Sequence, residues 1–143
     1  MRVVVGSDEQ EHVVDVVVDY LRGLGHTVDL VGPPGGGTEQ WAEVGHIVGR
    51  RVADGTADTG VLFCWTGTGA SIAANKVAGV RAALCTDAST AEGARRWNDA
   101  NILVMGLRLT SPTSAREMLD AWLSTGPEPT EADNIARAEH PDA

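Results

Sequence analysis

Short apolar runs alternate with longer amphipathic stretches along most of this 143-residue chain. The runs are rich in valine, isoleucine and leucine, which is typical of strands buried on both faces of a parallel sheet. They cover Arg2–Gly6, Val28–Val31, Gly60–Cys64, Val80–Cys85 and Asn101–Gly106. The alternation predicts an α/β fold, a Rossmann-like α/β/α sandwich around a five-stranded parallel sheet. The simplest doubly wound strand order is 2-1-3-4-5.

Helices are expected between these strands and after the last one. Apolar residues at near-helical spacing indicate the first helix, and Ser111 followed by Pro112 is a typical start for the last. The five expected helices cover Asp8–Leu24, Glu39–Ala53, a segment after Gly69, a segment after Asp87, and Ser111–Leu123. In this interpretation residues 1–125 form one domain, and residues 126–143 form an acidic, proline-containing tail that either packs on a partner or frays.

Charge and composition exclude several classes of protein. The chain has 11 lysine and arginine residues against 20 aspartate and glutamate residues, which gives a net charge of −9. A nucleic-acid binder or a protein docked on anionic membrane would carry a basic face instead. The first residues lack the pattern of a secretory signal, and two cysteines, Cys64 and Cys85, are too few for a disulfide scaffold. We therefore expect a cytoplasmic protein without nucleic-acid or membrane partners.

The expected strand order has a topological switch between the first and third strands. Ligands of such folds bind there, beyond the carboxyl ends of the strands. Two segments follow these strands, Gly6–Asp8 and Cys64–Ser71. The second carries two glycines and two threonines between a strand and a helix, so its backbone N–H groups could form an anion-binding nest. The alternative is a tight turn in which glycine serves packing alone.

Cys64 and Asp8 are the candidate catalytic side chains of these segments. A thiol beside a helix N-terminus can act as a base or nucleophile, although a lone cysteine is more often an inert core residue. Asp8 could hold a substrate hydroxyl or carry a proton, or it could be the N-cap of the first helix. The four histidines have no metal-ligand spacing with the cysteines, so we expect no metal site.

Four connected segments carry a resemblance to a known family. They are Gly6–Asp8, Thr66–Lys76, Gly79–Cys85 and Asn98–Asn101, and the run Ser-Ile-Ala-Ala-Asn-Lys is highly specific. Over roughly residues 1–125 the chain resembles the type B ribose-5-phosphate isomerase family, which includes the subunits of galactose-6-phosphate isomerase. The resemblance implies a Rossmann-like fold, a homodimer or sometimes a tetramer, and active sites that two subunits share.

The resemblance also implies a reaction, the aldose–ketose isomerisation of a sugar phosphate through a cis-enediol(ate), without cofactor or metal. Cys64 matches the base that removes the proton next to the carbonyl. Thr66 matches a threonine that passes a proton between the two substrate oxygens, and Asp8 an aspartate that holds hydroxyls. The remaining matches are the anion hole at Gly67, Thr68, Gly69, Ala70 and Ser71, Asn98 beside the enediolate, and Arg108 at the phosphate.

Departures from the family pattern gather around the expected site. Trp97 stands where the family has the histidine credited with opening the furanose ring, and an indole cannot act as that acid or base. Glu9 replaces another histidine, and Pro129–Ala132 replaces a stretch whose arginine and histidine hold phosphate. Trp41 and Trp65 replace a tyrosine and a glycine. The three tryptophans near the site either stack on the ligand or fill the space of lost polar groups.

These observations favour an active isomerase whose substrate differs from ribose 5-phosphate, such as an open-chain, less phosphorylated or bulkier sugar. The main alternative is a non-catalytic or partner-dependent sugar-binding subunit on the same fold. Retention of Cys64 favours the enzyme, and the missing histidine favours the subunit. A third interpretation is ordinary ribose-5-phosphate isomerisation, with Arg137 and a rearranged tail supplying the phosphate contacts.

Overall fold

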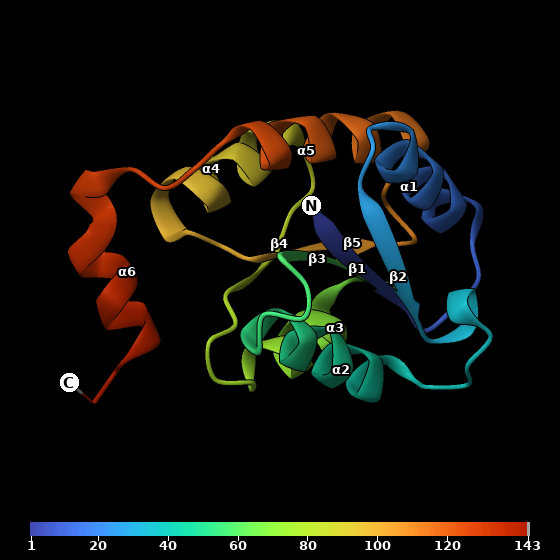
Figure 1. Ribbon diagram of the computed structural model, residues 1–143, viewed down its shortest axis with the longest axis horizontal. Helices are drawn as coiled ribbons and strands as arrows, with labels where there is room; N and C mark the ends of the chain where they lie inside the picture. The colour runs from blue at the N-terminus through green and yellow to red at the C-terminus, as the bar shows by residue number, and fades with distance from the viewer. Residues whose placement is uncertain (143) are drawn as a thin grey trace.

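The computed structural model describes residues 1–142 and contains one five-stranded parallel sheet between two layers of helices (Figure 1). The strands are β1 (Arg2–Ser7), β2 (Thr27–Val31), β3 (Thr59–Cys64), β4 (Ala82–Leu84) and β5 (Ile102–Gly106). β1 and β3 are neighbours, and they pair in parallel from Val3 opposite Thr59 to Ser7 opposite Phe63. The predicted α/β/α sandwich and the switch between the first and third strands are therefore confirmed.

The helices divide between the two faces of the sheet. They are α1 (His12–Gly23), α2 (Trp41–Ala53), α3 (Thr68–Asn75), α4 (Ala88–Asn98), α5 (Pro112–Ser124) and α6 (Ala132–Glu139), with short 3-10 turns η1 (Pro33–Gly35) and η2 (Pro129–Glu131). α1, α4 and α5 cover one face and α2 and α3 the other, as Figure 1 shows. Alternate residues of β3 supply the two cores, Val61 and Phe63 to one and Leu62 and Cys64 to the other.

The predicted order 2-1-3-4-5 is wrong for its last two strands. The observed order is β2-β1-β3-β5-β4, so β5 lies inside the sheet and β4 at its edge. All five residues of β5 are buried, because its long apolar side chains fill both cores. β4 has three residues, none of them buried, and the expected strand Val80–Cys85 is shortened at both ends. A short strand of small side chains is suited to a sheet edge.

The first helix begins later than expected, which also removes one interpretation of Asp8. α1 starts at His12 with Glu11 as its N-cap, four residues beyond the predicted start. In the loop between β1 and α1, the Ser7 hydroxyl donates a hydrogen bond to the Glu9 carbonyl at 2.6 Å, which stabilises the turn of the backbone there. Asp8 is therefore not the N-cap of α1. The predicted Ser111 cap is confirmed for α5, since the Ser111 hydroxyl accepts the Ser114 N–H at 3.1 Å.

The tail forms a helix that stands away from the main body. None of the eight residues of α6 is buried, and Figure 1 shows α6 (red) beside α4 at one side of the sandwich. A hollow of about 590 Å³ separates α6 from the body and is lined by Val80, Trp97, Asn98, Ile135 and Ala138, among others. Across the described residues, no helix has both the length and the apolar character to cross a membrane.

Candidate functional site

The candidate site lies at the edge of the sheet where β1 and β3 end. Ser7, the last residue of β1, pairs with Phe63 of β3, so Asp8 and Cys64 are the next residues along the two strands and lie at the same edge of the sheet. The carbonyl of Cys64 accepts the Leu107 N–H at 2.9 Å, which joins the end of β3 to the residues after β5. The fold therefore brings together the two segments that the sequence singled out.

The two cysteines lie on opposite faces of the sheet. Cys64 is 5% exposed and belongs to the core under α2 and α3, which also includes Ala70 of α3. Its thiol is therefore on the same side of the sheet as the first turn of α3. Cys85 belongs to the core under α1, α4 and α5, and burial raises its pKa to about 11. Cys85 is thus a neutral core thiol at physiological pH.

The loop after Cys64 has the geometry of an anion nest. Gly67 is the N-cap of α3 with φ of 80°, and a Cβ there would lie 2.5 Å from a methyl of Leu84, so only glycine fits. The Gly67 carbonyl accepts the Ser71 N–H at 3.1 Å. The backbone N–H groups that precede Ser71 in this first turn are free of intrahelical partners, as at any helix start.

The hydroxyls of this loop are held close together. The Thr66 and Thr68 side chains share a hydrogen bond of 2.7 Å between their oxygens, and both residues are exposed. The carbonyl of Thr66 packs on Gly106, where a Cβ would stand 2.8 Å from that oxygen. Gly106 and Leu84 also shape the loop, and neither was predicted from the sequence. The only available signal for Gly106 was a glycine at the end of a buried strand.

The ring of Trp41 and the backbone of Arg108 contact the same loop, which Trp65 belongs to. The Trp41 ring lies over Gly69, and Trp41 and Trp65 are 45% and 53% exposed. The carbonyl of Trp65 accepts the Arg108 N–H at 2.9 Å, so Arg108 follows β5 at this edge of the sheet. The structure thus groups Trp41, Trp65 and Arg108 with the glycine loop.

Asp8 carries a partly buried carboxylate that can accept a further hydrogen bond. Its Oδ1 atom is buried and accepts no hydrogen bond. Burial raises the pKa of Asp8, and a backbone hydrogen bond offsets part of this effect. An unpartnered buried carboxylate oxygen costs free energy, and a ligand hydroxyl that donates to it would recover part of that cost.

Trp97 and Asn98 do not join this group within one chain. They are the last residues of α4, just before the start of β5, whereas Cys64 lies where β3 ends. A five-residue strand spans about 15 Å, so the length of the sheet separates them from Cys64. Trp97 is 53% exposed and lies beside edge strand β4. Among the described residues no cluster of three or more His, Cys, Asp or Glu side chains could hold a metal ion.

The match to a family model covers most of the chain. The model of the ribose/galactose isomerase family matches residues 3–139. This chain belongs to the ribose/galactose isomerase family. The family consists of sugar phosphate isomerases of the ribose-5-phosphate isomerase B and galactose-6-phosphate isomerase type, so the resemblance seen in the sequence is confirmed. The protein is an isomerase of this type.

Individual relatives of this isomerase act on varied substrates. The D-erythrulose-4-phosphate isomerase of Pectobacterium atrosepticum is 35% identical over 125 residues, 86% of this chain and 82% of the relative. A 4-deoxy-4-sulfo-D-erythrose isomerase from a Clostridium species is 35% identical over 133 residues, 88% of this chain and 80% of the relative. The ribose-5-phosphate isomerase B structure from Clostridium thermocellum is 34% identical with a TM-score of 0.91, covering 99% of this chain and 97% of that one.

Proposed function

We propose that this isomerase interconverts an aldose and a ketose through a cis-enediol(ate), with Cys64 as the base. In the thiolate form, Cys64 takes the proton from the carbon next to the carbonyl, and the electron pair moves onto the carbonyl oxygen. The Gly67–Ser71 amides stabilise that charge, and Thr66 passes a proton between the two oxygens. Cys64 then returns its proton to the neighbouring carbon, which restores the thiolate and completes the reaction. The observation that carries the proposal is a buried thiol on the side of the sheet where α3 begins.

We propose that a second copy of the chain completes each site, in a homodimer or a tetramer built from such dimers. Asn98 and Trp97 match site positions of the family, yet in one chain they lie at the opposite end of the sheet from Cys64. Both line hollows beside the exposed edge strand β4, where another molecule can approach them. Two-fold association makes such an exchange reciprocal, because each copy then gives Asn98 and receives it.

The substrate is, in our proposal, an open-chain sugar of four carbons with an anionic group at carbon 4. A phosphate on O4, or a sulfonate on carbon 4, leaves no hydroxyl there to close a five-membered ring. Such a sugar needs no acid or base for ring opening, which agrees with Trp97 in place of the histidine implied by the resemblance. Two relatives are named for four-carbon substrates of this kind, D-erythrulose 4-phosphate and 4-deoxy-4-sulfo-D-erythrose. Arg108 is the cation expected to meet the anionic group.

A substrate panel tests this proposal. D-erythrose 4-phosphate, D-erythrulose 4-phosphate and ribose 5-phosphate are each incubated with the enzyme, and NMR follows the interconversion. We expect kcat/KM for a four-carbon phosphate to exceed that for ribose 5-phosphate by at least about 10-fold. A preference for ribose 5-phosphate would contradict the substrate assignment alone. A well-folded protein that converts no sugar would instead favour the non-catalytic, partner-dependent subunit.

A further inference from the structure

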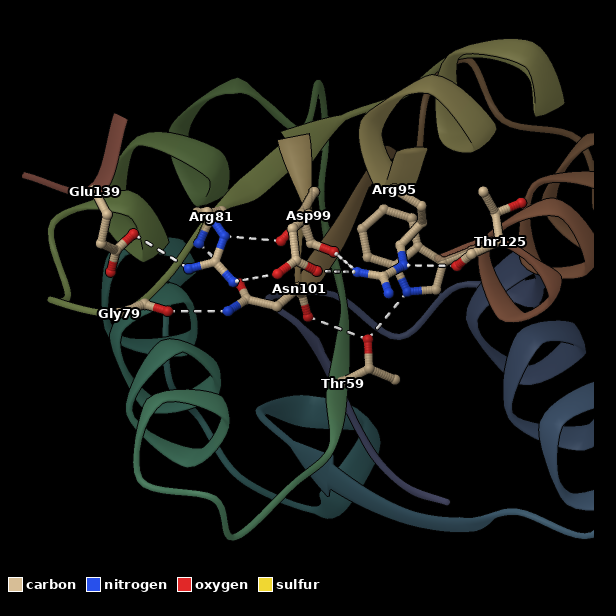
Figure 2. A network of polar contacts seen from close by, with 10 residues as sticks. Thr59, Gly79, Arg81, Arg95, Asp99, Asn101, Thr125 and Glu139 are labelled. Atoms are coloured by element: carbon tan, nitrogen blue, oxygen red, sulfur yellow. Dashed lines mark hydrogen bonds and ion pairs between the residues drawn. The ribbon is translucent and has the colours of Figure 1, made fainter. Parts of the chain in front are cut away.

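Two arginines enclose the turn between α4 and β5, at the opposite end of the sheet from Cys64 (Figure 2). Asp99 lies at the centre of this turn with φ of 46° and ψ of 44°. Within residues 1–142 it is the one non-glycine residue with positive φ. An aspartate tolerates this left-handed conformation, but the conformation persists only where the surroundings hold it.

Arg81 binds Asp99 and the tail helix at the same time. Its Nε donates to the Asp99 carbonyl at 2.8 Å, and its Nη2 lies 3.4 Å from the Asp99 carboxylate. Its Nη1 donates to Glu139 of α6 at 3.2 Å, as Figure 2 shows. The three side chains are 24%, 34% and 21% exposed, so water screens these contacts less than it screens a surface pair.

Arg95 holds the other side of the same turn. Its Nη1 donates to the second Asp99 carboxylate oxygen at 3.0 Å and to the Ala100 carbonyl at 2.6 Å. Its Nε donates to the Thr125 carbonyl at 3.1 Å, and its guanidinium lies 5.6 Å from the centre of the Trp122 ring. Arg95 is thereby fixed to the end of α5. Asp99 is held from both sides, by one arginine that reaches α5 and one that reaches α6.

The position of Asn98 depends on this turn because it is the residue before Asp99. Asn98 and Trp97 line the hollow of about 590 Å³ whose other wall is α6, through Ile135 and Ala138. α6 has no buried residue to fix its place. The Arg81–Glu139 pair ties α6 directly to the turn that carries Asn98.

We propose that Arg81 is a positioning residue of the isomerase: by binding Asp99 and Glu139 together, it sets the position of Asn98 and links it to the position of α6. This inference rests on the proposed function, in which Asn98 enters the site of a second copy. The fork of the guanidinium is essential, because a lysine cannot reach the Asp99 carbonyl, the Asp99 carboxylate and Glu139 with one ammonium group.

The first arm of the test uses hydrogen–deuterium exchange and needs no activity. Arg81→Gln is compared with the wild type and with Arg2→Gln, a matched control that removes another 3.2 Å arginine–carboxylate pair, Arg2 with Asp58. We expect Arg81→Gln to increase deuterium uptake in residues 97–101 and 132–139, and Arg2→Gln to leave both segments unchanged. Glu139→Gln is the second variant if Arg81→Gln does not fold, and it should increase uptake in residues 132–139. Unchanged uptake in these segments would overturn the inference.

The second arm asks whether Arg81 acts through Asn98. We expect Arg81→Gln to lower kcat by roughly 10- to 100-fold, the effect of a misplaced group, with a smaller loss for Arg81→Lys. When Asn98→Ala is already present, adding Arg81→Gln should lower kcat by less than about a further twofold. Losses that multiply would overturn the positioning role, because a merely structural defect multiplies in this way. A wild type that converts no sugar contradicts the proposed function only, and the exchange arm then decides the inference.

Discussion

The indole of Trp41 lies directly over the backbone of Gly69, so that a Cβ on Gly69 would stand 2.8 Å from ring atom Cε3. Gly69 is in the first turn of α3, and Trp41 is the first residue of α2. The absence of a side chain at residue 69 therefore allows an aromatic ring to cover the loop that we propose as the anion hole. Because Trp41 is 45% exposed, its ring has space to move outward when residue 69 grows.

Gly69→Ala is expected to displace the Trp41 ring from the loop. We expect KM to rise by about 10-fold because the ring no longer closes one side of the site. The melting temperature should change little, since alanine favours the helix while the contact with the ring opposes it. Steady-state kinetics and tryptophan fluorescence measure the two effects. Gly23→Ala is the matched control, because a Cβ at Gly23 meets nothing within 4 Å; an unchanged KM in Gly69→Ala would contradict the role of Trp41.

Asp8→Asn is expected to stabilise the protein at neutral pH while lowering its activity. Burial raises the pKa of Asp8 above its ordinary value of 3.8, so the folded state disfavours the charged form. The folded state therefore loses stability as the pH rises from 3.8 through the raised pKa. Removing the charge should raise the melting temperature at pH 7 and leave it unchanged well below pH 3.8. Thermal unfolding at both pH values measures this difference, and substrate turnover should fall because the carboxylate no longer holds a hydroxyl.

Asp58→Asn is the control for Asp8→Asn, because it should change the stability of the protein in the opposite direction. A hydrogen bond from the Arg2 backbone N–H, at 2.8 Å, is the main cause that lowers the pKa of Asp58. Its stabilising contribution is therefore present above pH 3.8 and is lost as the pH falls through the lowered value. Asp58→Asn should lower the melting temperature at pH 7 and leave turnover unchanged. If both substitutions shift stability in the same direction, the account of Asp8 is wrong.

Trp97→His is expected to extend the substrate range to cyclic pentose phosphates. The resemblance implies a histidine at this position in relatives that open the furanose ring, and an imidazole can supply the acid and base that an indole lacks. We expect turnover of ribose 5-phosphate to rise by at least about 10-fold, which is less than the roughly 100-fold that a well-placed acid–base group supplies. A coupled assay measures it. Trp97→Phe is the control, since it changes the size of the side chain without adding a titratable group.

Mixing two inactive variants tests whether two copies share each site. Cys64→Ala and Asn98→Ala each spoil every site of their own homodimer. After unfolding and refolding as an equal mixture, half of the dimers are mixed, and each has one site with both residues intact. About a quarter of the wild-type activity should therefore return. No recovery, with mixed dimers shown to be present by mass, would place Asn98 in the same site as its own Cys64 or outside the site.

The sequence was informative where local pattern decides structure. Buried apolar runs predicted all five strands, and Ser111 with Pro112 predicted the start of α5. The order of β4 and β5 was predicted wrongly because both runs were apolar. The difference in side-chain size, Ile102–Met105 against Ala82–Leu84, was the signal that placed β5 inside the sheet.

Long-range polar contacts could not be predicted in this way. Arg81 and Glu139 are 58 residues apart, and although Arg81 lies in the segment Gly79–Cys85, nothing in that segment indicates a pair with the tail. The left-handed conformation of Asp99 arises in a turn that contacts from α5 and α6 enclose, so no local pattern indicates it. The neighbourhood of Cys64, Asp8 and the glycine loop could be predicted, because the ends of adjacent parallel strands meet at one edge of the sheet.

The measurement that tests the central claim most directly is solvent deuterium incorporation at the carbon next to the carbonyl. Cys64→Ala and Cys85→Ala are compared with the wild type on D-erythrulose 4-phosphate by NMR. The account predicts that Cys64→Ala lowers the incorporation rate by at least about 100-fold, because the base is gone. Cys85→Ala, which removes the thiol on the other face of the sheet, should stay within about twofold of the wild type. Incorporation by Cys64→Ala at the wild-type rate would contradict Cys64 as the base.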